Sequence, residues 1–337
     1  MNREEVTPMT VTVRDIAREA GVSAATVSRA LARPDSVAPD TRQRVIEVAG
    51  RLGYVAAPSR RSDGRSATAS IGLVVPDLDN PTFASLLKSA EQRCRVRGYA
   101  VLVGDCEKDA EIEADLVRDL SGRVDGLVIC SPRSEPGTIA AFAEQVPLLV
   151  VDGHGEGLTS VTVDYTGGMD QVVTHLTALG HRQLAYAGGR TSTWSELERR
   201  EGLRRALAER GLPEYVDLGA FTAGIAGGYA AADQLLATPA TAIVCINTLV
   251  ALGLINRLNQ RGLSVPGDMS IVEFDTANTS RLASPLLTTV APPPGTVGWT
   301  AADVMVQTIE NPADTVNSRK IPVELSIQQS TGAPRSS

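Results

Sequence analysis

The stretch VRDIAREAGVSAATVSRAL, which runs from Val13 to Leu31, reads as two short helices joined by a sharp turn at Gly21. Thr12 and Asp15 form a capping pair for the first helix, because both side chains can accept free N–H groups of its first turn. Gly21 stands just past the helix end, where a left-handed backbone is needed and glycine adopts it without steric cost. Ser23 then caps the second helix.

The second of these helices has one face to bury and one face to expose. Its apolar residues at helical spacing are Val27, Ala30 and Leu31, and its other face carries Ala24, Ala25, Ser28 and Arg29. A third helical segment follows at residues 39–52. Three short helices with a tight turn are typical of a helix-turn-helix, whose second helix lies in the DNA major groove. The alternative is a small helical cap or dimerisation element without DNA contact.

Charge is distributed unevenly along the chain. Residues 1–65 carry 11 Lys and Arg against 8 Asp and Glu, whereas the remaining residues carry 21 against 31. The whole chain therefore has a net charge of −7 although its first segment is basic. This asymmetry favours a DNA-binding head on an acidic body.

The body alternates short apolar runs with segments of helical periodicity. The runs include IGLVV, AVLVG, DGLVIC, PLLVV, QLAYAGG, TAIVCI and MSIVEF. Such alternation predicts parallel sheets with helices on both faces, that is, an α/β body. The length of 337 residues allows a head plus more than one ordinary core, so we expect two lobes with a small-ligand cleft between them.

The remaining sequence features argue against export, membrane insertion, metal binding and catalysis. Residues 1–10 lack the apolar core of a signal peptide and no run approaches a membrane span, so we expect a cytoplasmic protein without a membrane partner. The four cysteines lack close spacing and should be reduced core thiols. The loop GHGEG at 153–157 lacks the third glycine of a dinucleotide turn. The histidines lack zinc spacing and no nucleophile–base pair stands out. We expect no enzyme, no catalytic residue, no metal and no cofactor.

The chain resembles the LacI family of bacterial transcription regulators, the lactose and galactose repressors. The resemblance rests on TVRDIAREAGVSAATVSRAL, VAPDTRQRVIEVAGRLGY, IGLVVPDLDNPTF, GLVIC, HLTALGHRQLAYAGG, RGLSVPGDMSIVEFD and SPLLTTV, in the family's order, over about residues 10–332. It implies a small all-α helix-turn-helix head and a two-lobed body like that of periplasmic sugar-binding proteins. Residues 10–54 would be the DNA-binding domain, 55–69 the hinge, and 70–332 the effector-binding and dimerisation domain, with one lobe at about 70–164 and 291–318 and the other at about 165–290 and 319–332.

The resemblance also assigns the DNA contacts. They would be made by Ser23, Ala24, Ala25, Thr26, Ser28, Arg29, Tyr54, Arg60 and Arg61. Arg29 would carry most of the direct readout, because it can bond bidentately to guanine whereas alanine only meets a thymine methyl. A homodimer would match a palindromic operator on double-stranded DNA. The hinge is shorter than usual in the family and lacks its leucine, so a disordered basic tether is the alternative to a folded hinge.

The effector contacts implied by the resemblance lie at strand ends in both lobes. They are Asp79, Asn80, Ser131, Asp152, Arg199, Phe221, Asn247 and Asp275. Carboxylate, amide and guanidinium groups suit a polyhydroxylated ligand. The chain departs from the family at Thr248, Thr276 and Pro292, which removes two carboxylates and an amide. The effector could then be a carbohydrate, a less hydroxyl-rich or anionic metabolite, or absent.

These observations predict a sequence-specific DNA-binding transcriptional repressor, controlled by a small sugar or related metabolite between the two lobes. One alternative is a solute-binding protein without a transcriptional role, which would share the body but has no use for a basic helical head. A sugar-modifying enzyme is the other alternative, and it would need a base or nucleophile in the cleft.

Overall fold

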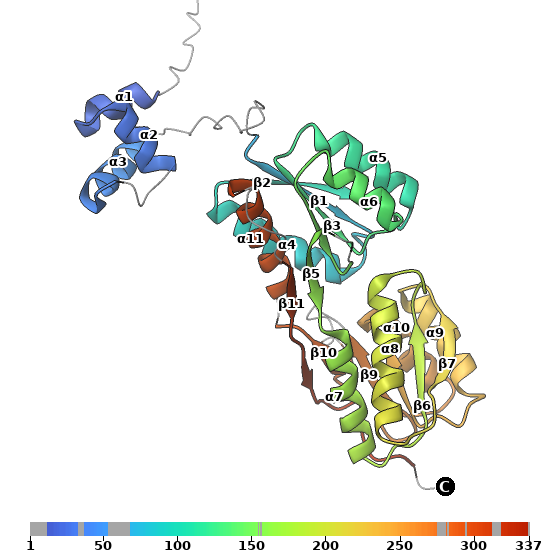
Figure 1. Cartoon of the computed structure of the whole chain (residues 1–337). Helices are drawn as coiled ribbons and strands as arrows, with labels where there is room; N and C mark the ends of the chain where they lie inside the picture. The colour runs from blue at the N-terminus through green and yellow to red at the C-terminus, as the bar shows by residue number, and fades with distance from the viewer. Residues whose placement is uncertain are drawn as a thin grey trace, which may run out of the picture. The chain divides into compact units, whose positions relative to one another are not determined.

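A computed structural model describes residues 12–32, 37–52, 68–153, 155, 157–274, 281, 283–293, 295–311 and 318–335. The chain divides into two compact units, residues 1–66 and residues 67–337. In the first unit, the head, the described residues form α1 (Val13–Ala20), α2 (Ala24–Ala32) and α3 (Pro39–Leu52) (Figure 1). The second unit, the body, holds the remaining helices and the strands.

The head is built by the local signals expected from the sequence. The Asp15 carboxylate accepts the Thr12 backbone N–H at 3.0 Å and the Thr12 hydroxyl at 2.6 Å, which fixes the start of α1. Gly21 has φ 67° and its N–H donates to the Ala17 carbonyl, so α1 ends in the left-handed turn that glycine permits. The three helices meet in a core of small and medium side chains: Ile16, Ala17, Ala20, Val27, Ala30, Val45, Val48 and Ala49.

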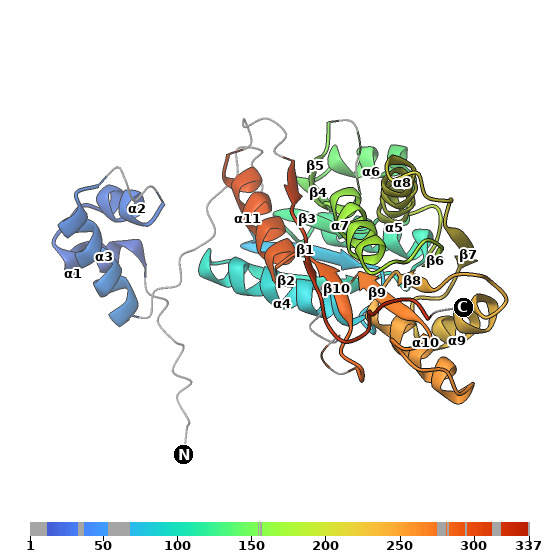
Figure 2. The same cartoon turned by 90° about the horizontal axis from the view of Figure 1, so that it is seen from below.

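The first lobe of the body is a parallel sheet covered by helices on both faces. Its strands, in spatial order, are β11 (Arg319–Ile321), β5 (Thr159–Val163), β4 (Leu148–Val151), β3 (Gly126–Cys130), β1 (Ser70–Val75) and β2 (Ala100–Asp105). Its helices are α4 (Pro81–Val96), α5 (Ala110–Ser121), α6 (Pro136–Ala143) and α11 (Thr296–Glu310). α4 and α11 lie side by side (Figures 1 and 2).

Strand β1 shows why both faces of this sheet are covered. Ile71, Leu73 and Val75 pack in the cluster that includes α4 and α11, whereas Val74 packs with α5 and α6. Alternate side chains of a strand point to opposite faces, so a strand that is apolar at every position needs a helical layer on each side. The uninterrupted run IGLVV therefore required this arrangement.

The second lobe repeats the plan of the first. Its strands, in spatial order, are β12 (Glu324–Ser326), β10 (Thr288–Ala291), β9 (Ser270–Phe274), β8 (Ala242–Cys245), β6 (Leu184–Gly188) and β7 (Val216–Ala220). β12 is antiparallel to β10, and the other pairs are parallel. Its helices are α7 (Tyr165–Ala178), α8 (Trp194–Glu209), α9 (Ile225–Leu235) and α10 (Thr248–Gln260). The prediction of a two-lobed α/β body is confirmed.

The chain passes between the lobes after β5, after β10 and after β11 (Figure 1). The last crossing differs from the expectation that residues 319–332 belong to the second lobe. Arg319–Ile321 pair in parallel with Val161–Val163 of β5, so β11 belongs to the first sheet and only the residues after it reach the second. A three-residue strand carries no pattern that identifies its sheet, and the hydrogen-bonding partner alone decides it.

Within the described ranges, each helix is too short or too polar to span a lipid bilayer. The four cysteines are buried and unpaired there, as expected of core thiols.

Candidate functional site

The outer face of α2 carries side chains that the sequence assigns to DNA contact. Ser23, Ala24, Ala25 and Arg29 are exposed and Thr26 is half-buried, whereas Val27 and Ala30 on the opposite side are buried in the head core. The side chain of Ser28 and residues Tyr54, Arg60 and Arg61 lie outside the described residues.

Two contacts within α2 bear on how these side chains could meet a partner. The Ser23 hydroxyl accepts the backbone N–H of Thr26 at 3.0 Å, so it caps the helix as well as facing outward. The Arg29 Nε donates to the Ala25 carbonyl at 3.3 Å, and the guanidinium remains at the surface. The described part of this face therefore carries small side chains and one cation, Arg29, which suits a groove of DNA.

The body contains a cavity of about 510 Å³ lined from both lobes. This volume falls in the range of small-ligand sites. The cavity lies at the carboxyl ends of the parallel strands, where open α/β sheets bind ligands. Of the expected effector contacts, those that line it are Asn80, Ser131, Asp152, Arg199, Phe221 and Asn247.

Two expected contacts behave differently. Asp79 does not line the cavity: it is exposed, and its backbone N–H donates to the Asp77 carboxylate at 2.9 Å. The turn before α4 points it outward because the next residue, Asn80, caps the helix by accepting the Thr82 N–H at 3.1 Å. Asp275 lies outside the described residues.

Backbone strain marks two of the cavity residues. Ser131 has φ 45° and Asp152 has φ 50°, and each directly follows a buried strand, β3 and β4 respectively. A left-handed backbone at a non-glycine residue costs of order 1 kcal/mol and tends to occur at functional positions. The strain turns both side chains at the ends of neighbouring strands into the space between the lobes.

Asp152 is held at the edge of the cavity by the segment that crosses between the lobes. Its carboxylate accepts the Tyr165 hydroxyl at 2.6 Å and the Val163 backbone N–H at 3.1 Å. Burial raises the pKa of Asp152, although the hydrogen bond from Tyr165 and the charge of Arg199 act in the opposite direction. The side chain can therefore accept or, when protonated, donate a hydrogen bond to a ligand.

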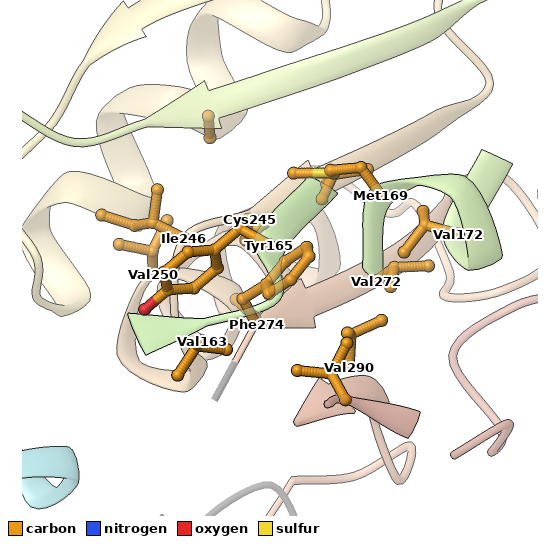
Figure 3. Close-up of a cluster of buried hydrophobic side chains, with 14 of the residues drawn as sticks. Val163, Tyr165, Met169, Val172, Cys245, Ile246, Val250, Val272, Phe274 and Val290 are labelled. Atoms are coloured by element: carbon orange, nitrogen blue, oxygen red, sulfur yellow. The ribbon is translucent and has the colours of Figure 1, made fainter. Parts of the chain in front are cut away.

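Arg199 of α8 lies on an aromatic platform. Its guanidinium carbon is 4.1 Å from the ring centroid of Tyr165 and 5.6 Å from that of Phe274. Figure 3 shows the two rings among the apolar side chains of Val163 and Val290. Burial by itself would lower the pKa of Arg199, but the neighbouring Tyr165, Tyr186, Glu196 and Asp152 raise it, so the side chain stays charged. Its Nε is buried without a hydrogen-bond partner among the described residues.

Asn247 and Phe221 complete the second-lobe wall. The Asn247 side chain accepts the Val250 N–H at 2.9 Å and so caps α10, and its Nδ2 donates to the Ala223 carbonyl at 3.4 Å. Its amide therefore already serves the protein, which limits what it can offer a ligand. Phe221 follows β7, and its ring is half-buried at the cavity.

Sequence reasoning missed several cavity residues: Lys108, Arg133, Tyr165, Arg190 and Glu196. The sequence could have indicated Arg133, because this residue stands two positions after Ser131 in the loop that follows β3. Tyr165 gave no such signal, since only the crossing of the chain between lobes brings it to the cleft. In the described part of the chain, no cluster of His, Cys, Asp and Glu could hold a metal ion.

Known protein families account for both units. Residues 12–57 match the family described as bacterial regulatory proteins, lacI family. Residues 68–329 match the periplasmic binding proteins and sugar binding domain of LacI family.

Individual relatives extend over almost the whole chain. The HTH-type transcriptional repressor CytR of Escherichia coli is 31% identical over 333 residues, covering 96% of each protein. A lac repressor dimer bound to operator and the anti-inducer ONPF is 27% identical with a TM-score of 0.73, covering 96% of this chain and 99% of that one. A LacI family transcriptional regulator from Enterococcus faecium with bound ribose is 27% identical with a TM-score of 0.72, covering 78% and 99%.

Proposed function

This chain belongs to the LacI family of bacterial regulatory proteins, and on that premise we propose that it is a sequence-specific DNA-binding repressor controlled by a small effector in the cleft between the lobes. It acts in the cytoplasm, where its operator lies. The observation that carries the proposal is that an exposed, cation-bearing face on α2 occurs together with a cavity in the body that is lined by polar and apolar side chains. A solute-binding protein without a transcriptional role would use the cavity alone.

The head supplies the DNA contacts. Arg29 bonds bidentately to a guanine, and Ala24 and Ala25 pack against thymine methyls. Ser23 and Thr26 bond to phosphates, which sets the register of α2 without reading sequence. The basic balance of residues 1–65 supports this placement, since phosphate neutralisation supplies much of the affinity of such complexes.

A two-fold homodimer presents two heads to a palindromic operator. Identical half-sites are contacted symmetrically when the protein has the same symmetry as its DNA. The lac repressor dimer bound to operator, which this chain resembles over nearly its full length, supports the same arrangement here.

The body supplies the control. A carbohydrate or related polar metabolite lies between Asn80, Ser131 and Asp152 of the first lobe and Arg199, Phe221 and Asn247 of the second. A ligand that contacts both lobes favours one relative arrangement of them by its differential affinity, and that arrangement changes the spacing of the two heads. The relative with bound ribose supports a ligand of this chemical class.

The test begins with selection of binding sites from random DNA by the full chain. We expect an enriched palindrome. Arg29→Ala should then lose about 1–3 kcal/mol of binding per half-site on the selected operator, with little loss on scrambled DNA at the same salt. Arg205→Ala, an exposed body arginine, is the matched control and should bind as the wild type does. Equal losses of Arg29→Ala on both DNAs would contradict base reading by this residue.

A further inference from the structure

The cavity is surrounded by an excess of positive charge. Among the described residues that line it, the cations are Lys108, Arg133, Arg190 and Arg199, and the carboxylates are Asp152 and Glu196. Glu196 is already engaged, since it accepts Arg200 Nε at 2.7 Å and the Tyr186 hydroxyl at 2.9 Å. Its charge is therefore paired with Arg200 inside the second lobe, although it also acts on Arg199.

Arg133 makes no salt bridge to another described residue, although the charges of Glu113 and Asp77 act on it. The loop that carries it is held by Glu113, a fully buried carboxylate that accepts the backbone N–H groups of Arg133 at 2.8 Å and Ser134 at 2.9 Å. Glu113 thus fixes the loop through its backbone and does not pair with the guanidinium through a hydrogen bond to Nε. Arg133 Nε and Ser134 Oγ are both buried without a hydrogen-bond partner in the described structure. Arg133 as a whole is only half-buried and lines the cavity, so its guanidinium can meet an anionic ligand there.

Arg190 of the second lobe lies close to this group. Its Nη1 donates to the backbone carbonyl of Lys108 at 3.2 Å, which brings the two lobes together at this end of the cavity. Burial lowers the pKa of Arg133 and so does the charge of Arg190, although Cys106, Glu113 and Asp77 act in the opposite direction. Lys108 is paired with Asp77 at 2.5 Å, whereas the charge of Arg190 in the second lobe acts on Arg133 in the first.

Helix geometry adds to the positive potential. α4, α8, α10 and α11 all have residues of their first turn or cap in the cavity wall, namely Thr82, Ser195, Asn247 and Val297. The amino end of each helix carries a partial positive charge from its aligned peptide dipoles. The cavity is therefore built from four such ends in addition to its side-chain cations.

We propose, building on the effector function above, that the effector carries an anionic group, a phosphate or a carboxylate, bound between Arg133 of the first lobe and Arg190 of the second. The anion compensates the charges of Arg133 and Arg190 and relieves the repulsion between them. Because these groups belong to different lobes, the anion links the lobes directly. The polar body of the same ligand then reaches Asp152 and Arg199.

Inorganic phosphate and the pair D-ribose and D-ribose 5-phosphate are the probes, with D-ribonate as the carboxylate arm. All are compared with chloride at equal ionic strength by thermal unfolding of the full chain and by calorimetric titration. We expect phosphate to raise the unfolding midpoint of the body, and ribose 5-phosphate or ribonate to bind at least about tenfold more tightly than ribose. The tighter of the two anionic sugars identifies the group.

Arg133→Met tests the placement. It should weaken binding of the anionic probes about tenfold or more and leave ribose binding unchanged. Without ligand it should still fold, and its own midpoint in chloride is the baseline for its phosphate response, because the substitution also removes a positive charge near the buried Glu113. Arg123→Met, at an exposed arginine of the same lobe, should keep the full phosphate response.

Each contrary outcome is decisive. No midpoint difference between phosphate and chloride in the wild type, or an undiminished phosphate response in Arg133→Met, would overturn the inference. Ribose binding as tightly as ribose 5-phosphate and ribonate would overturn it too, yet would leave the effector function standing. Failure of every ligand to alter operator binding while the anion still binds at Arg133 would instead reject the control function and retain the anion site.

Discussion

The head and the body assemble their functional side chains in different ways. In the head, one turn and one helix, Ser23 to Arg29, carry the described residues proposed to face DNA. The buried core residues described behind them are no larger than isoleucine. In the body, the cavity wall contains residues from Pro76 to Gly298, which lie at the ends of two sheets. A contact surface on one helix therefore needs only a small hydrophobic core behind it, whereas a two-lobed ligand site needs a large core to bring together residues that are distant in sequence.

The largest expected effect concerns the hydrophobic cores of the two units. Ile16 of the head and Ile271 of the body are both fully buried, and truncation of either to alanine should cost about 2–5 kcal/mol. A core as small as that of the head supplies about 3–5 kcal/mol in total, so Ile16→Ala should unfold much of the head at 25 °C. Ile271→Ala should leave both units folded at that temperature.

Calorimetric melting and DNA binding of the two variants provide the measurement. Ile16→Ala should abolish operator binding while the main transition of the body stays in place. A single transition that shifts equally in both variants would show that the two units unfold together, contrary to the division of the chain into two compact units.

The next effect concerns Arg199, which lies in the body and far along the chain from the head. Arg199→Ala removes a buried guanidinium stacked on Tyr165, and should weaken the effector response at least about tenfold. Operator affinity of the ligand-free protein should be nearly unchanged, because the DNA-facing residues lie in the other unit. Fluorescence anisotropy with labelled operator, titrated with effector, measures both. A variant that responds at the wild-type ligand concentration would remove Arg199 from the site.

A smaller effect tests the support of Asp152. Tyr165→Phe keeps the ring beneath Arg199 but removes the 2.6 Å hydrogen bond to the Asp152 carboxylate. Loss of one such bond to a buried group should cost about 1–2 kcal/mol of body stability at neutral pH. The cost should shrink in acid, because a protonated Asp152 needs fewer donors. Urea unfolding at two pH values measures it, and a cost that is the same at both would contradict an ionised Asp152.

The smallest expected effect is a difference between the two units in how their stability depends on pH. His181 in the body is buried and contacts Thr241 Oγ1 at 2.7 Å and the Gly332 carbonyl at 2.9 Å. Burial lowers its pKa below the ordinary 6.5. Near pH 6.5 and below, the unfolded chain therefore binds a proton at His181 more readily than the folded body does. The stability contributed by His181 is present above that pH, and it falls as the pH drops toward the lowered pKa.

The head should respond only in stronger acid. Hydrogen bonds from Thr12 lower the pKa of Asp15 below its ordinary 3.8, so its contribution is present above about pH 4 and is lost as the pH falls through the lowered pKa. Between pH 7.5 and 5 we therefore expect the midpoint of the body alone to fall, and His181→Gln to reduce that fall. An unchanged pH slope in this variant would assign the titration to another group.

Much of the architecture could be predicted because it depends on short-range signals. The capping pair of Thr12 and Asp15, the left-handed turn at Gly21 and the apolar stripe through Val27 involve residues no more than a few positions apart. The apolar runs of the body predicted buried parallel strands for the same reason. The resemblance to a known family then placed six side chains, from Asn80 to Asn247, that line the cavity.

The sequence alone thus determined the helix-turn-helix, the α/β rhythm and the family. Only the tertiary structure decided that β11 joins the first sheet, that Asp79 turns outward, and that Tyr165 lies beneath Arg199. Only the tertiary structure also placed Arg190 of one lobe beside the loop of Lys108 in the other, 82 positions apart in sequence. Helix caps and hydrophobic periodicity depend on interactions between residues that are close in sequence, so they can be recognised from the sequence alone. A cleft depends instead on strand order and on the chain's crossings between lobes, which create proximity that no local pattern encodes.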